Sequence, residues 1–213
     1  MRVIGACLVV FLVTYSYAAP YETKPFPKHV EDFIGVIIAE SGLELERLLR
    51  HYGENTDFGY AVTYFRTENF KEVWHETQTL PEFKAVIRFL DDAQIDVVYS
   101  LSRINELLDM NEPVRFRKRP PGNVKESSAL NSFINESMGF FPKSKLAALF
   151  EQKMKEDSNF RNTIDKLKTK EWERLYDALW RSPEFKSLVY TVHENGLDVR
   201  LLIEQVIAVF GQN

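Results

Sequence analysis

The chain has 213 residues, of which 45% are hydrophobic and 27% are charged, as in an ordinary soluble globular protein. Its formal net charge is −4 at pH 7, and this acidic balance argues against a nucleic-acid-binding protein, which would need a basic face. Phenylalanine accounts for 16 residues, so the chain has much bulky apolar surface to bury.

The first residues have the pattern of a secretory signal peptide. Arg2 precedes an apolar run over residues 3–13, and the small residues Ser16 and Ala18 suit the two positions that the signal peptidase recognises. We expect residues 1–18 to be removed, because the apolar run is too short to span a bilayer. The single cysteine, Cys7, would leave with this segment. The mature chain would then be a secreted protein without a disulfide or a thiol nucleophile.

Residues 19–28 contain three prolines, which predicts an extended lead-in. Apolar residues at helical spacing then predict a helix over residues 29–40 and a second over residues 43–52, with a break at Ser41-Gly42. Asn55-Thr56-Asp57 offers an N-cap for the helix that follows.

The segment Leu80-Pro81-Glu82-Phe83-Lys84 returns as Ser182-Pro183-Glu184-Phe185-Lys186, at an offset of 102 positions (183 − 81 = 102). The same offset relates Phe70 to Trp172 and the capping residue Asp96 to Asp198. A fixed internal period predicts one supersecondary unit used twice. Proline at the first helical position and glutamate in the first turn favour a helix start, so the repeated segment has a structural explanation.

We count six helices in each copy and no convincing strand. The expected fold is all-α, with two six-helix repeats over residues 29–110 and 125–213 that form one helical shell. The last predicted helix is apolar around most of its circumference, and such a helix should be surrounded by others.

The linker between the copies is predicted at residues 111–124, where three prolines and a glycine exclude a helix. It carries a basic run that includes Arg115, Arg117 and Lys118. One interpretation is a solvated linker. Another is a site sensitive to trypsin-like proteases, and a third is attraction to an anionic membrane surface.

No catalytic motif stands out, so we expect no enzyme, no metal and no cofactor. The four histidines have no spacing that suits a metal site, and we expect them at the surface or at helix ends: His29, His51, His75 and His193. Asn135-Glu136-Ser137 is an N-glycosylation sequon, and its position in a predicted helix leaves occupancy open.

The predicted interior is apolar and permits two interpretations. Its residues either fill a core or line a cavity large enough for acyl chains, and helical periodicity does not distinguish these cases. The candidate cavity residues are Phe33, Ile37, Phe65, Phe83, Ile87, Leu101, Leu202 and Val206.

Three segments of the second copy carry a resemblance to a known family. They are residues 182–186, Gly196-Leu197-Asp198-Val199, and residues 141–150. Together they make the chain similar to the insect allergen-related repeat family, which includes cockroach group 1 allergens, mosquito midgut G12-type proteins and nitrile-specifier proteins of butterfly larvae. The first copy matches less closely, since Leu80 replaces the capping serine.

The resemblance implies a helical shell of two repeats around a large apolar cavity that carries fatty acids or phospholipids. It also implies secretion into the gut lumen or onto the microvillar surface, with lipids and a membrane surface as partners. We therefore expect a lipid-binding protein that could exchange lipids with membranes. The alternatives are a nitrile-specifier-like detoxification protein and a microvillar structural protein, and the oligomeric state stays open.

Overall fold

The computed structural model describes residues 25–65, 67–95, 97, 129–201, 203 and 204. Every regular element in these ranges is a helix, which confirms the predicted all-α class. The helices are α2 (Pro25–Gly53), α3 (Thr56–Tyr64), α4 (Glu68–Thr79), α5 (Pro81–Asp92), α7 (Ala129–Phe140), α8 (Lys143–Glu156), α9 (Ser158–Lys166), α10 (Lys170–Arg181) and α11 (Pro183–Glu194). Within the described part of the chain, none of them is both long enough and apolar enough to cross a bilayer.

Helix α2 corrects two expectations, because it runs unbroken for 29 residues. The extended lead-in does not include residues 25–28, which form the first turn of α2. Proline is tolerated there because the first N–H groups of a helix have no partner within the helix. The break expected at Ser41-Gly42 is also wrong. Glycine within a helix costs about 1 kcal/mol, but Ser41 is buried against the end of α7, so packing outweighs the local preference.

The internal period is confirmed for three pairs of helices. Helices α9, α10 and α11 begin and end 102 positions after α3, α4 and α5 (158 − 56 = 102). The caps recur as well, since Thr67 Oγ accepts from the N–H of Phe70 and Thr169 Oγ accepts from the N–H of Trp172. Six helices per copy remain a prediction, because residues 98–128 and 205–213 lie outside the described residues.

The two copies differ in the segment that forms α2 in the first copy. The segment that corresponds to α2 in the second copy is divided into α7 and α8, with Phe141 and Pro142 between them. Proline lacks an N–H and clashes with the carbonyl four residues earlier, so a straight helix cannot continue through position 142. One continuous helix of the first copy is therefore matched by two separate helices in the second.

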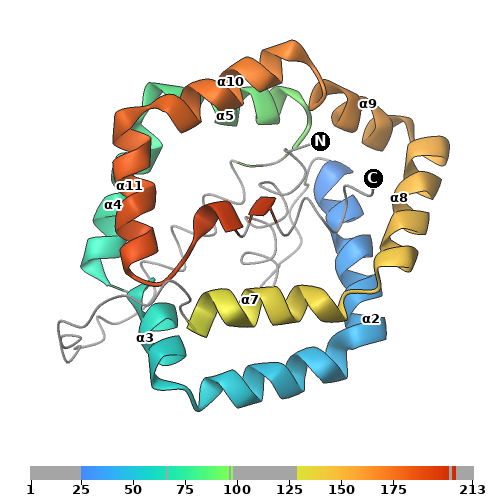
Figure 1. Ribbon diagram of the computed structural model, residues 1–213. Helices are drawn as coiled ribbons and strands as arrows, with labels where there is room; N and C mark the ends of the chain where they lie inside the picture. The colour runs from blue at the N-terminus through green and yellow to red at the C-terminus, as the bar shows by residue number, and fades with distance from the viewer. Residues whose placement is uncertain (1–24, 66, 96, 98–128, 202, 205–213) are drawn as a thin grey trace.

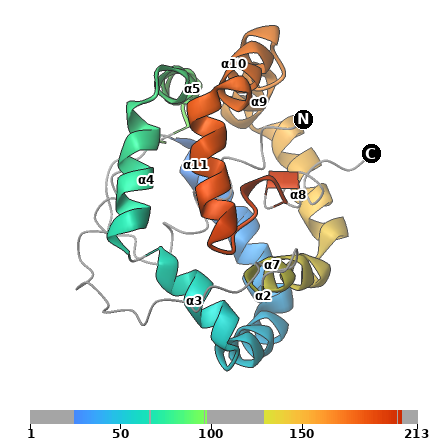
Figure 2. The same ribbon diagram turned by 60° about the vertical axis from the view of Figure 1, so that its left-hand side comes forward.

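The helices are arranged as a ring, with α7 lying inside it alongside the C-terminal half of α2 (Figure 1). Helix α5 packs on α10, and α4 packs on α11, so the two copies interleave. Figure 2 shows α4 and α11 side by side. The largest buried cluster joins both copies: Phe26, Val30 and Phe33 of α2 lie in one core with Phe160 and Ile164 of α9 and Trp172 of α10.

Candidate functional site

The structure describes five of the eight predicted cavity residues, and it places four of them in or against the largest core. Phe33 and Ile37 of α2 are buried at 3% and 6% exposure, whereas Phe83 and Ile87 of α5 are half-buried at the edge of that core. Phe65 packs instead against a second cluster that contains Tyr52, Phe58 and Leu130. The remaining candidates, Leu101, Leu202 and Val206, lie outside the described residues.

The exposed fractions divide the candidate cavity residues into those that fill the core and those that keep exposed surface. Phe33 lies 6.2 Å from the ring of Phe160 and is covered by protein side chains, so it contributes to the packed core. Phe83 and Ile87 keep part of their surface uncovered. Side chains of this second kind are the ones that can contact an apolar ligand.

Helix α2 also presents large apolar side chains that are exposed in the described part of the chain. Ile38 is 63% exposed and Leu49 is 51% exposed. They are about three turns apart, and half-buried Leu45 lies between them on the same face. We call Ile38, Leu45 and Leu49 the α2 apolar face. The sequence identified these residues as apolar but gave no indication that they would stay exposed.

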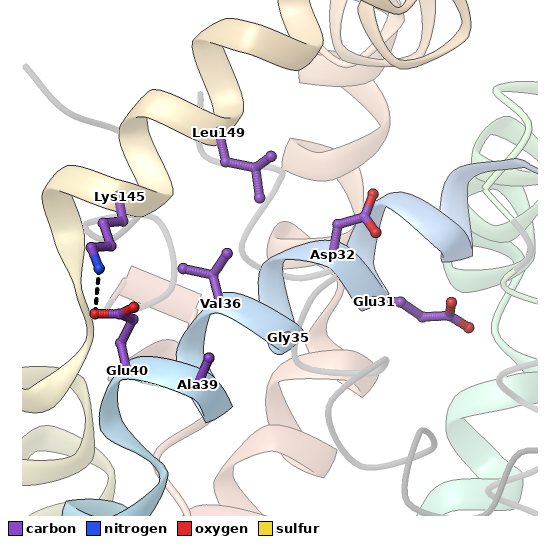
Figure 3. Close-up of a pocket in the computed structure, with 8 residues that line it drawn as sticks. All are labelled: Glu31, Asp32, Gly35, Val36, Ala39, Glu40, Lys145 and Leu149. Carbon is purple, nitrogen blue, oxygen red and sulfur yellow. Dashed lines mark ion pairs between the residues drawn. The ribbon is translucent and has the colours of Figure 1, made fainter.

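An open groove of about 460 Å³ runs between α2 and α8. Small and apolar residues line its middle, and charged residues line its ends: Glu31, Asp32, Gly35, Val36, Ala39, Glu40, Lys145 and Leu149 (Figure 3). Space is left at Gly35, where a Cβ would meet nothing within 4 Å. An ion pair of 2.5 Å between Lys145 and Glu40 closes one end (Figure 3). The apolar middle of the groove can contact an apolar chain.

The other end of this groove meets a junction of charged and aromatic residues, which we call the His29 junction: His29, Asp32, Lys153 and Asp157. Lys153 Nζ of α8 lies 3.2 Å from Nδ1 of His29 and 2.5 Å from Oδ2 of Asp32. Asp157, the N-cap of α9, places Oδ2 3.6 Å from Nε2 of His29. The junction therefore links the first turns of α2 to the end of α8 and the start of α9.

His29 was expected at the surface or at a helix end, and the structure corrects its environment. The side chain stands in the second turn of α2 but is only 7% exposed. Its ring lies edge-on to Phe160 at 5.1 Å and to Phe26 at 6.1 Å. Burial and the ammonium of Lys153 lower the pKa of His29 from its ordinary value of 6.5, although Asp157 and Asp32 act in the opposite direction.

A row of aromatic rings runs along α10 and reaches α5 at one end and α11 at the other. Trp172, Tyr176 and Trp180 of α10 follow at centroid distances of 6.1 and 6.0 Å. Phe89 of α5 lies 5.3 Å from Trp172, and Phe185 of α11 lies 5.2 Å from Trp180. Aromatic pairs of this kind contribute about 0.5–1.5 kcal/mol each beyond area burial, so the Phe89–Trp172 pair strengthens the contact between α5 and α10.

The sequence predicted a glycosylation site and a protease-sensitive site, and the structure describes only the first of them. Asn135 is exposed on α7, whereas Ser137 of the same sequon has its Oγ buried without a hydrogen-bond partner. Glycosylation of Asn135 stays a prediction. The predicted protease-sensitive residues Arg115, Arg117 and Lys118 lie outside the described residues.

Comparisons with known proteins match nearly the whole chain. A family model described as insect allergen related repeat, nitrile-specifier detoxification, matches residues 26–203. Protein G12 of Anopheles gambiae is 23% identical over 208 residues, which cover 98% of this chain and 96% of that protein.

Proposed function

Because the chain belongs to the insect allergen-related repeat family, we propose that it is a secreted gut protein that binds fatty acids or phospholipids between its helices. The proposal includes exchange of these lipids with membranes. The α2 apolar face and the half-buried residues Phe83 and Ile87 form part of the lipid-contacting surface in this proposal.

The observation that carries the proposal is the exposure of large aliphatic side chains on the longest described helix. Burying a leucine or isoleucine stabilises a protein by about 1.5–3 kcal/mol, and Ile38 and Leu49 forgo most of that gain in the protein alone. Exposed apolar surface of this kind is typical of a binding site. An acyl chain laid against these residues would recover the missing burial.

Lipid binding of this kind requires no catalytic group. Each methylene removed from water contributes about 0.8 kcal/mol, so twelve methylenes supply about 10 kcal/mol before the costs of association. A ligand that binds only the folded state also raises the melting temperature by mass action. This would stabilise a mature chain that contains no cysteine.

The direct test is to extract the natively purified protein with organic solvent and identify lipids by mass spectrometry. We expect acyl lipid in the extract, a lower melting temperature after stripping, and recovery when a long-chain fatty acid is added back. An extract without lipid, together with a melting temperature that stripping leaves unchanged, would contradict the proposal.

Two variants of α2 test the location of the site. Ile38→Asn combined with Leu49→Asn should reduce fatty-acid binding at least tenfold, because it places amides on the α2 apolar face. Leu43→Asn is the matched control, since Leu43 is 67% exposed but lies on a different side of α2, about 1.4 turns from Ile38. Equal losses in both variants would show that the effect is not specific to this face.

The family description supports a second candidate, a nitrile-specifier-like detoxification protein. That function predicts a changed product distribution from a glucosinolate breakdown mixture and no need for retained lipid. Assaying the stripped and the lipid-loaded protein side by side separates the two functions. A third candidate, a microvillar structural protein, predicts that the protein sediments with gut membranes instead of staying in the soluble fraction.

A further inference from the structure

The hydrogen-bonding capacity of the His29 junction determines which nitrogen of His29 carries its proton. An ammonium group has only donors, so Lys153 Nζ donates to Nδ1 of His29 at 3.2 Å. Nδ1 is then the acceptor, and the proton of the neutral ring lies on Nε2. That nitrogen is buried without a hydrogen-bond partner, and Oδ2 of Asp157 lies 3.6 Å away.

A second proton on His29 would have to bind at Nδ1, which faces the Lys153 ammonium. Two cations 3.2 Å apart repel each other, so Lys153 would have to withdraw. Lys153 also donates to Asp32 of α2, and its withdrawal would break that contact as well. The new imidazolium would be drawn toward Asp157 on α9, while Lys28 on α2 opposes the charge.

We propose that His29 is a proton-operated latch between α2 and α8. In the neutral form the ring accepts from Lys153 and keeps the end of α8 against the second turn of α2. Protonation expels Lys153 and opens this end of the groove. The far end stays closed, because Lys145 and Glu40 form their ion pair there without contacting His29.

The internal repeat relates the His29 junction to an equivalent set of positions, and the residues of the latch are present only in the first set. Moving by 102 positions takes His29 to Asn131, Lys153 to His51 and Asp157 to Asn55. There, Oδ1 of Asn131 accepts from the N–H of Asp198 at 3.0 Å. The equivalent of Asp32 is Ile134. Acidification should therefore loosen only the seam between α2 and α8, so the response is asymmetric.

Hydrogen exchange of the full-length protein tests the latch, with protection factors corrected for the intrinsic effect of pH. Between pH 7.5 and 5.5 we expect protection of amides in residues 29–36 and 150–157 to fall about tenfold in the wild type. His29→Asn, which installs the residue found at the equivalent position, should abolish this step. His51→Asn is the matched control and should preserve it. A step that persists in His29→Asn, or no step in the wild type, would overturn the proposal.

If His29→Asn does not fold, titration of the His29 ring by NMR tests the coupling between His29 and Lys153 without that variant. The His29 ring of the wild type should titrate with a pKa below 6.5, the ordinary value. Lys153→Met should raise that pKa, because it removes the opposing cation, whereas Lys145→Met in the same groove should leave it unchanged. A wild-type pKa at or above 6.5, or no response to Lys153→Met, would show that Lys153 and His29 are not coupled.

Discussion

Ser41 Oγ donates a hydrogen bond of 2.6 Å to the carbonyl oxygen of Phe140, and this bond joins the middle of α2 to the last residue of α7. The bond lies where the first copy continues as one helix and the second copy stops before Pro142. It satisfies a carbonyl that the end of α7 leaves without a helical partner. A single serine hydroxyl thus couples the middle of the continuous helix of one copy to the break between two helices of the other.

Ser41→Ala should destabilise the protein by about 0.5–2 kcal/mol, because it leaves the Phe140 carbonyl without its partner. Part of the loss is offset by the higher helix propensity of alanine. Urea unfolding followed by circular dichroism measures the change. Ser187→Ala, in the middle of α11 and exposed, is the control and should be neutral or slightly stabilising. Equal behaviour of the two variants would show that the bond to Phe140 contributes little.

Gln94→Gly should stabilise the protein by about 0.5–1 kcal/mol. Gln94 follows α5 with a φ of 65°, and its repeat equivalent after α11 is Gly196 with a φ of 104°. A residue with a Cβ is strained in this region by about 1–2 kcal/mol, part of which is offset because glycine gains freedom in the unfolded chain. Gly196→Ala should have the opposite sign in the same unfolding experiment. A destabilising Gln94→Gly would mean that the glutamine side chain makes compensating contacts.

Asp157→Asn should leave the stability of the protein at pH 7 nearly unchanged. It should also remove the part of the stability that the wild type loses when acid protonates the Asp157 carboxylate. The Asp157 carboxylate accepts from the N–H of Phe160 at 2.9 Å, and this bond lowers its pKa from 3.8. A carboxyl whose folded pKa is depressed stabilises the protein above its unfolded pKa, and that contribution is lost as pH falls through the folded pKa. Asparagine caps almost as well, so the variant should show a flatter stability profile below about pH 4.

Asp157→Ala provides the contrast, since it removes the cap as well as the charge. It should cost about 1 kcal/mol at pH 7. Denaturant unfolding at pH 7, 4 and 3 separates the two variants. If Asp157→Asn kept the full acid sensitivity of the wild type, the loss would have to come from other carboxyl groups.

Phe160→Ala should destabilise the protein by about 3–5 kcal/mol, as large-to-small changes of buried phenylalanine do. Phe160 is 2% exposed, and its ring contacts Phe26, Phe33 and Phe150. Phe140→Ala is the control, because Phe140 is 42% exposed and should cost much less. Thermal unfolding of both variants checks the difference. Similar losses would indicate that the exposed surface of Phe140 is covered in solution.

The elements that could be predicted are those governed by local chemistry. Helix α11 begins at Pro183 behind the cap Ser182, as the sequence indicated, and the caps Thr67 and Thr169 follow the same rule. The internal period required only pairwise comparison of the sequence with itself. The capping signals depend on neighbours within a few residues, so tertiary packing rarely overrides them.

The features that could not be predicted depend on contacts between distant segments. The continuity of α2 through Gly42 depends on burial of Ser41 against α7, which is almost a hundred positions away. The burial of His29 depends on Phe160 and Lys153, which are more than 120 positions away, so the residues around His29 do not predict it. The groove exists because α2 and α8 approach each other at small residues such as Gly35 and Ala39. Periodicity identified apolar faces but not which of them remain uncovered.

The interleaving of the copies has a consequence for the durability of the fold. Helices that precede position 98 share a buried core with helices that follow position 128, and α4 and α5 each lie against a helix of the other half. Severing the chain between these positions would therefore divide the covalent backbone without freeing either fragment. A nicked molecule should migrate intact on a native gel and fall into two pieces only under denaturing conditions.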